Sequence, residues 1–348
     1  MPIRRQLLLP SIDDYLGPGR TRFFARGYQR AVYRVRDIEA GPADGPEPGA
    51  HAVVDVDYPA NWSRKDDDGD LRPHLSTIDA LVLGVQLAQL HLTHAHRLSV
   101  SAQRRMRLRK VVLRAGGEPQ EDLRDIPLSA RPVRSEPPVP GAPRRRLSTY
   151  DCVVGSLRLR CGIEHDISDR ETGTRRYASF DEALGPAEQR FYGDGFKARR
   201  HAIGNVRVDM DALTARADVH FPADGAGPYT GDGIDGALQP SVSLVDAFVV
   251  SLQLAQVLMY ELDAVPRAAS NTLWMMRTVL EAAAVPRSLP SHPQAPLVAE
   301  TALASKRLLP LRGGIWRSVE IDGNFAGISL RSSFAHELPA EAAAHAVG

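Results

Sequence analysis

The sequence predicts an α+β protein made of two copies of one domain, in each of which an antiparallel sheet wraps around one long helix. Two pairs of matching segments indicate the duplication: residues 11–27 match residues 179–195, and residues 73–89 match residues 240–256. The second pair, PHLSTIDALVLGVQLAQ and PSVSLVDAFVVSLQLAQ, is apolar on nearly every helical face, which is typical of a helix enclosed by protein. A helix enclosed by a curved sheet is the hotdog arrangement, so two such units in tandem predict a double hotdog.

We expect domain boundaries that follow the repeat: residues 1–167, residues 168–336 and a flexible tail over 337–348. Within each repeat the predicted order is a strand hairpin, the long helix, a strand, a proline-rich insertion and a closing hairpin. These elements are expected over 27–58, 75–92, 104–114, 116–146 and 150–164, and again over 196–221, 242–262, 272–281, 285–296 and 316–334. The two sheets are expected to join edge to edge, which would hide their edge strands. The alternative is two independent α+β domains on a flexible linker.

Composition narrows the classes of partner. The formal net charge is +1 and charged residues make up 24% of the chain, so no strong field points to nucleic acid or to a membrane surface. We expect no segment to span a bilayer. Cys152 and Cys161 have no neighbours in metal-ligand spacing, which predicts a reduced, cytoplasmic protein. A homodimer is compatible with these properties.

Asp79 and Asp246 are the leading candidates for catalysis. Each lies near the start of a long apolar helix, where a carboxylate must be paired, capped or functional. Burial would raise its pKa toward the range useful for a general acid or base. The alternative is that each aspartate only complements the helix dipole, with Ser76 and Ser243 as N-caps.

Four further residues could work with these aspartates. His74 and His220 each occur in one repeat only, and a histidine facing an aspartate across the domain interface would form an acid/base pair. Taken alone, each histidine also fits a surface or structural role. Gln86 and Gln253 lie two helical turns after the aspartates on the same face, where an amide could bind substrate or bond a strand.

Three other motifs carry weaker signals. Arg105, Arg107 and Arg109 alternate and so share a strand face that could meet the phosphates of coenzyme A or of a carrier arm, although a solvated face is equally compatible. No metal site is predicted, because the histidines that close the first helix lack a carboxylate or cysteine to complete a ligand set. The glycine-rich segment 224–236 is interpreted as an active-site loop or a surface turn.

The segments SIDDYLGPGRTRFFARGYQRAVYRV, VDYPANWSRK and HLSTIDALVLGVQLAQ resemble the AvrD family of bacterial avirulence D, or syringolide biosynthetic, proteins. The resemblance implies an enzyme that joins a β-ketoacyl thioester to a ketose and forms a butenolide-type signal. Trp62, which lies in the second of these segments, is also expected to bind substrate. Separately, LVDAF at the second helix resembles the helix start of hotdog acyl-thioester dehydratases and A-factor synthesis proteins, where Asp246, and by the repeat Asp79, would take the acidic position.

These observations together predict an acyltransferase or condensing enzyme. In this hypothesis an aspartate and a histidine deprotonate the acceptor hydroxyl, while the helix N-terminus polarises the thioester carbonyl. The acyl donor would be carried on coenzyme A or an acyl carrier protein, and no bound cofactor is expected. Two alternatives are an acyl-thioester dehydratase or hydratase, and a lipid-signal binding module without catalysis.

Overall fold

The computed structural model describes residues 5–43, 48–60, 62–63, 72–137, 144–168, 172–222, 231–270, 273–283, 289, 295–311 and 313–347. The strands are β1 (Gln6–Ser11), β2 (Val32–Ala40), β3 (Ala50–Asp57), β4 (Arg107–Arg114), β5 (Ile126–Glu136), β6 (Arg145–Val154), β7 (Leu157–Asp166), β8 (Arg175–Tyr177), β9 (Ala202–Asp209), β10 (Thr214–His220), β11 (Trp274–Ala282), β12 (Leu297–Leu311), β13 (Gly314–Phe325) and β14 (Ile328–Glu337). The α-helices are α1 (Asp13–Leu16), α2 (Thr77–Ala95), α3 (Val100–Arg104), α4 (Phe180–Leu184), α5 (Leu244–Leu262) and α6 (Ala340–Val347).

The described strands form one 14-stranded antiparallel sheet. Strands at equal distances from its two ends are equivalent strands of the two repeats. The order is β1-β9-β10-β12-β13-β14-β11-β4-β7-β6-β5-β3-β2-β8. Its centre is the β11–β4 pair, where Val279 lies opposite Val112, its own counterpart at the repeat offset. The sheet therefore has an approximate twofold axis at this pair, and the two halves share one sheet, as predicted, in place of separate domains on a linker.

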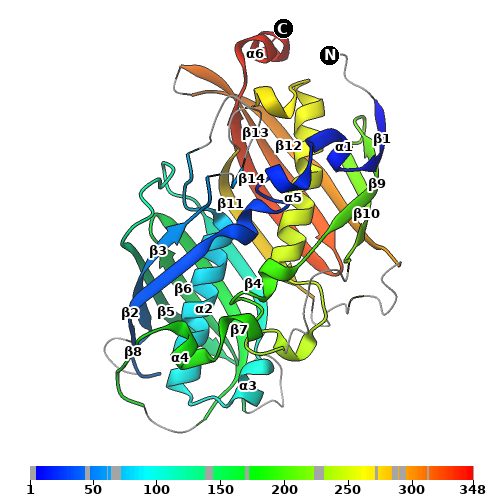
Figure 1. The fold of residues 1–348 in the computed structure, drawn as a ribbon. Helices are drawn as coiled ribbons and strands as arrows, with labels where there is room; N and C mark the ends of the chain where they lie inside the picture. The colour runs from blue at the N-terminus through cyan, green and yellow to red at the C-terminus, as the bar shows by residue number, and fades with distance from the viewer. Residues whose placement is uncertain are drawn as a thin grey trace.

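Each half of the sheet curves around one helix, so the protein is a double hotdog. Figure 1 shows α2 lying across the strands of the first half and α5 across those of the second. The predicted enclosure of both helices is confirmed, because all but one residue of α2 is buried and α5 is buried over most of its length. Among the described residues, α5 is also long and apolar enough to span a membrane, but 89% of its apolar window is buried in the protein.

The first strand of each repeat pairs with the sheet of the other repeat. β1, from the N-terminus, pairs with β9 of the second half, and β8 pairs with β2 of the first half. β1 and β8 occupy equivalent positions before the matching segments 11–27 and 179–195. The chain therefore crosses from one half of the sheet to the other at both β1 and β8, an exchange that was not predicted from the sequence.

The predicted strand count was also too low. β5 lies inside the first proline-rich insertion, which was expected to be loop, and β12 follows the second insertion as an unpredicted strand. β5 carries Pro127 and Pro132 and has a register shift after Pro132, so proline falls where the ladder is irregular. The chain ends in α6, within the segment that was expected to be a tail.

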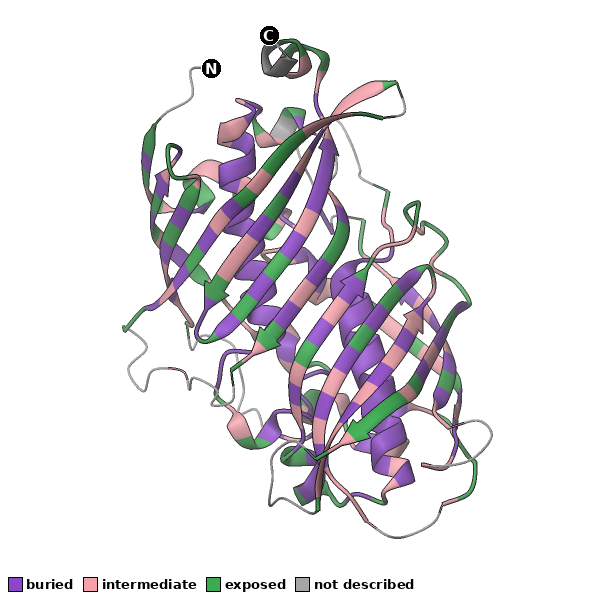
Figure 2. Ribbon diagram, turned by 180° about the vertical axis from the view of Figure 1, so that it is seen from behind, coloured by how far each residue is buried: buried purple, intermediate pink, exposed green. Residues whose placement is uncertain are grey.

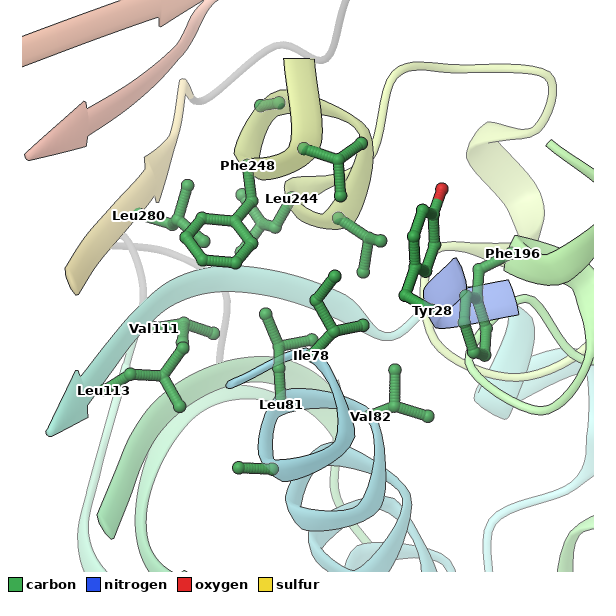
Figure 3. Packing of buried hydrophobic residues seen from close by; sticks show 14 of the residues in the cluster. Tyr28, Ile78, Leu81, Val82, Val111, Leu113, Phe196, Leu244, Phe248 and Leu280 are labelled. Atoms are coloured by element: carbon green, nitrogen blue, oxygen red, sulfur yellow. The ribbon is translucent and has the colours of Figure 1, made fainter. Parts of the chain in front are cut away.

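One hydrophobic cluster spans both halves. Figure 3 shows the starts of the two long helices facing each other, with Phe248 and Leu244 of α5 above Ile78 and Leu81 of α2. Beside them Tyr28 stacks on Phe196, with ring centroids 6.2 Å apart. The helix N-termini therefore pack against each other close to the twofold axis, through the apolar residues of this cluster.

Candidate active site

The main cavity lies between the repeats, at the start of α2. It has a volume of about 480 Å³ and reaches from Ser76 and Thr77, at the start of α2, to Gln256 and Tyr260 in the second half of α5. All three tryptophans of the chain line it, namely Trp62, Trp274 and Trp316. It also contains the predicted site residues His74 and Trp62, whose rings meet edge to face at 5.7 Å. A pocket of this size and apolar character is typical of a small-molecule site.

At the start of α2, Asp79 closes a capping box. The Ser76 side chain accepts from the Asp79 amide at 3.1 Å, and the Asp79 carboxylate accepts from the Ser76 amide at 2.8 Å. Tyr33 donates to the other carboxylate oxygen at 2.8 Å, and Tyr58 donates to the oxygen that the Ser76 amide also uses. Asp79 is fully buried, and three donors satisfy its two carboxylate oxygens, so this carboxylate stabilises the start of the helix.

At the start of α5, Asp246 repeats the capping box with different partners. The Ser243 amide and hydroxyl donate to one carboxylate oxygen, at 2.8 and 2.7 Å. His201 Nε2 lies 2.7 Å from the other oxygen, where the first repeat has the Tyr33 hydroxyl. The counterpart of Tyr58 is Phe221, which has no hydroxyl and packs on the His201 ring at 5.2 Å. Two tyrosines therefore bind the carboxylate at the start of α2, and a histidine binds the one at the start of α5.

The two environments shift the pKa values of Asp79 and Asp246 in opposite directions. Burial raises the pKa of Asp79, although the hydrogen bonds from Tyr58, Ser76 and Tyr33 oppose it. Burial also acts to raise the pKa of Asp246, but the charge of Arg199 and the hydrogen bond from His201 outweigh it, so this pKa is lowered. Asp246 is thus held ionised, while Asp79 is held closer to its neutral form.

The predicted pairing of an aspartate with His74 or His220 is replaced by a different partner. Asp79 accepts hydrogen bonds from Tyr33, Tyr58 and Ser76, and Asp246 is bonded by Ser243 and His201. His201 was missed, although it stands in the repeat column of Tyr33, so aligning the two hairpins residue by residue would have indicated it. His220 ends β10, in the column of Asp57, and neither aspartate lines either cavity that we describe.

Gln86 and Gln253 anchor the crossing segments. Arg190, from the second repeat, donates to the Gln86 amide oxygen at 2.8 Å, and Arg22, from the first repeat, donates to Gln253 at the same distance. Both arginines are almost completely buried. Each glutamine therefore binds the opposite repeat through its amide oxygen, which favours the structural role over substrate binding.

In the second repeat, the position equivalent to the main cavity is nearly closed. Its cavity has a volume of only about 30 Å³ and is lined by Ser241, Ser243 and Leu244, the counterparts of His74, Ser76 and Thr77. Residues 231–236, the described end of the glycine-rich segment 224–236, continue into residues 237–239 at this position, and Asp235 and Leu238 lie in the wall of the small cavity. Residues 224–230 lie outside the described residues.

Two contacts hold residues 231–239 in place. Asp235 accepts from the Leu108 amide at 3.1 Å and from the Tyr192 hydroxyl at 3.3 Å, and its burial raises its pKa to about 7. Gly233 has φ +74° and lies against Gln89, the counterpart of cavity residue Gln256; a β-carbon there would come within 3.0 Å of the Gln89 amide nitrogen. The second site is thus occupied by the protein itself.

The arginine prediction needs one correction. Arg105 caps α3 and does not share a strand face with Arg107; it pairs with Asp166, while Arg109 pairs with Glu164. Arg107 lines the small cavity beside Asp235. Among the described residues no group of three histidine, cysteine, aspartate or glutamate side chains could hold a metal ion.

Solved structures with a similar arrangement include RV0216 from Mycobacterium tuberculosis, described as having a double hotdog fold, at a TM-score of 0.39 and 12% identity over 76% of this chain and 82% of that one. The 12:0-ACP thioesterase from Umbellularia californica has a TM-score of 0.38 and 9% identity over 88% and 97% of the two chains. A variant of the PpsC dehydratase domain from Mycobacterium tuberculosis has a TM-score of 0.33 and 13% identity over 87% and 97%.

Curated protein sequences give no match to this chain. The family comparison is specific, however, because the model of the Pseudomonas avirulence D protein (AvrD) matches residues 7–339. That range includes both repeats, both helix starts and every residue that lines the main cavity. This chain belongs to the AvrD family.

Proposed function

We propose that this protein is an enzyme that acts on acyl thioesters, and that its working site is the cavity at the start of α2. The observation that carries the proposal is the open cavity of about 480 Å³ beside a helix N-terminus in one repeat, against a filled twin in the other. Family membership and the hotdog architecture, which the thioesterase and dehydratase named above share, support an acyl-thioester substrate.

The start of α2 supplies the electrophilic part of the proposed site. The capping box uses the amides of Ser76 and Asp79, and it leaves the amides of Thr77 and Ile78 without an intrahelical acceptor, as in the first turn of any helix. Ser76 and Thr77 line the cavity. A thioester carbonyl at this helix end would be polarised by free N–H groups and by the helix dipole.

His74 is the proposed general base. It is half-buried, lies in the cavity wall two residues before Ser76, and is positioned against the Trp62 ring. In the proposed step His74 takes the proton of an acceptor hydroxyl, whose oxygen attacks the thioester carbonyl carbon. The carbon–sulfur bond breaks, and the leaving thiolate takes the proton back from the imidazolium. Asp79 acts indirectly, because it fixes the helix start through Ser76 and Tyr58.

The finer proposal is that the donor is a β-ketoacyl thioester and the acceptor a ketose or related hydroxylated compound. After acyl transfer, the carbon between the two carbonyls would attack the ketone of the acceptor, and loss of water would give a butenolide. The aromatic wall formed by Phe23, Phe24 and the tryptophans fits an acyl chain, and the Ser63, Gln120 and Glu118 side chains on the same cavity fit hydroxyl groups.

Thiol release tests the proposal directly. The purified protein would be incubated with a 3-oxoacyl thioester of N-acetylcysteamine, with and without xylulose or dihydroxyacetone phosphate, while free thiol and the condensed product are measured. We expect thiol release that depends on the acceptor and a product whose mass equals donor plus acceptor minus thiol and water. Thiol release no faster than without protein would overturn the proposal.

A dehydratase or hydratase is the second candidate, because the imidazole of His74 in the wall of the open cavity could also remove and return a proton of the acyl chain. Interconversion of 3-hydroxyacyl and enoyl thioesters without acceptor would distinguish this activity. A binding module without catalysis would retain a lipid ligand in the cavity and release no thiol with any of these substrates.

A further inference from the structure

We infer that the outer face of the sheet beside the open cavity is a docking surface for an acidic carrier protein that delivers the thioester. The surface is a row of three arginines on neighbouring strands: Arg277 on β11, Arg114 on β4 and Arg158 on β7. We call it the arginine row. The inference rests on the proposed function, because it names the form in which the acyl donor arrives.

The arginine row concentrates positive charge. Arg277 lies directly opposite Arg114, and Arg114 lies directly opposite Arg158. Residues opposite one another on antiparallel strands are about 5 Å apart, so the three side chains start within about 10 Å. All three are exposed. Like charges directly opposite one another destabilise a sheet, so this arrangement calls for an external anion.

The acidic residues close to the row form ion pairs with other basic residues. Asp151 pairs with Arg160, Asp322 pairs with Arg331, and Glu281 pairs with Lys110. In the described part of the chain, no carboxylate forms an ion pair with an arginine of the row. The row therefore leaves a positive surface over the centre of the sheet.

The other repeat provides an internal comparison. By the repeat, Arg158, Arg114 and Arg277 correspond to Ser329, Glu281 and Lys110, which are also aligned across β14, β11 and β4. In that row Lys110 and Glu281 form an ion pair at 2.9 Å, so the row is neutral. The basic row and the neutral row occupy equivalent positions on one sheet, and the duplication alone does not account for their difference.

The basic row adjoins the open cavity and the neutral row adjoins the filled one. Arg114 directly precedes cavity residues Ala115 and Gly116, and Arg158 directly follows Ser156 and Leu157. The neutral row is next to Ala282, Ala283 and Ile328, which line the small cavity. The positive row is thus adjacent in sequence to the walls of the open cavity, and the neutral row to the walls of the small one.

The shape of the surface favours a protein over a nucleotide. Figure 2 views the sheet from this outer side, where exposed positions alternate with buried ones along the strands. The arginine row lies on this open face and not among the residues that line either cavity, whereas a nucleotide is normally held in a concave pocket. Complementary charge on an open face speeds association and selects the partner. A carrier protein with an acidic surface and a thioester on a flexible arm fits both the row and the adjoining cavity.

The sequence of the other repeat supplies the test variant. R114E/R158S/R277K reproduces the neutral row, and R207E/K306S, on exposed positions of β9 and β12, makes the same change in net charge elsewhere. Each protein would be assayed with one 3-oxoacyl group on an acidic acyl carrier protein, on coenzyme A and on N-acetylcysteamine. Binding of the carrier protein would be measured by fluorescence anisotropy at several salt concentrations, and folding by thermal melting.

We expect the row variant to lower kcat/KM with the acyl carrier protein by about tenfold or more, to weaken carrier binding and to flatten its salt dependence, with N-acetylcysteamine turnover within about twofold of wild type. The control variant should behave as wild type. Equal loss with all three donors, or carrier binding unchanged in the row variant, would overturn the inference, and so would a loss confined to coenzyme A, which would identify a nucleotide site. If wild-type protein turns over no thioester, the proposed function fails, while carrier binding still decides the inference.

Discussion

The two helix starts have the same frame and different chemistry. Asp79 and Asp246 each complete a capping box and are buried at equivalent positions, yet one is bonded by Tyr33 and Tyr58 and the other by His201. A buried carboxylate must be satisfied in any fold, so the capping box is retained on both sides. The remaining partners can change, because a tyrosine hydroxyl and an imidazole nitrogen can each occupy the same carboxylate oxygen.

The same contrast holds for the space in front of each helix. One repeat leaves a cavity of about 480 Å³, and the other fills its equivalent with residues 231–239. A duplicated scaffold can therefore keep one working site and use the other for stability. The predictions that follow test this division, beginning with the largest expected effect.

Replacing the histidine of the open site should abolish turnover and leave the fold intact. H74A removes the proposed base, and general-base catalysis is typically worth about 100-fold or more in rate. The matched change in the filled site, S241A, should have almost no effect on thiol release. Equal rates for the two variants, with unchanged melting temperatures, would contradict the assignment of the working site to the first repeat.

Removing the buried arginines should destabilise the protein unequally. Arg190 donates hydrogen bonds to Gly185, Gln86 and Asp181, and R190M would remove the Arg190 donor to the buried Gln86 oxygen. We expect a loss of about 2–4 kcal/mol in the free energy of unfolding. The Nε of its counterpart Arg22 is buried without a partner, so R22M should cost less.

Urea unfolding of both variants measures the difference. A larger loss for R22M than for R190M would show that the two crossings are not held in the way the contacts indicate.

The filled site should give stability a pH dependence. Burial raises the pKa of Asp235 to about 7 in the folded protein, above its unfolded value near 4, while Leu108, Tyr192, Arg107 and Arg109 act to lower it. Protonated Asp235 therefore contributes its full free energy of folding below about pH 4. This contribution is lost as the pH rises from about 4 through 7, because the unfolded chain releases the proton first.

The variant D235N cannot ionise and can still accept from the Leu108 amide. Between about pH 4.5 and 7 the free energy of unfolding of wild type should fall relative to D235N, by up to about 1.4 kcal/mol per pH unit, and the difference should level off above about pH 8. Urea unfolding at four pH values checks this. Parallel curves for the two proteins would contradict it.

The smallest effect on stability is expected when the tyrosine of one helix start and the phenylalanine of the other are each replaced by its counterpart. Y58F copies Phe221 and removes one donor to Asp79, which should cost about 1 kcal/mol and raise the pKa of Asp79 further. F221Y should recover less, because His201 and Ser243 already occupy both oxygens of Asp246. A gain for F221Y as large as the loss for Y58F would mean that the second carboxylate lacks a donor.

Several features could be predicted from local pattern. The matching segments predicted two equivalent units, the apolar helices predicted their own enclosure, and serine followed by aspartate three residues later is a capping-box pattern. His201 was within reach of the same method, since the repeat places it with Tyr33. The prediction instead favoured His74 and His220, which differ between the repeats in a more visible way.

The sequence by itself determined the duplication, the double hotdog and the buried carboxylate at each helix start, because these depend on periodicity and on residues close together in the chain. Only the tertiary structure decided the exchange of β1 and β8, the contacts of Arg22 and Arg190 with the opposite helices, and which of two equivalent cavities is open. These features arise from residues more than 100 positions apart, and no local spacing encodes how such segments pack against one another.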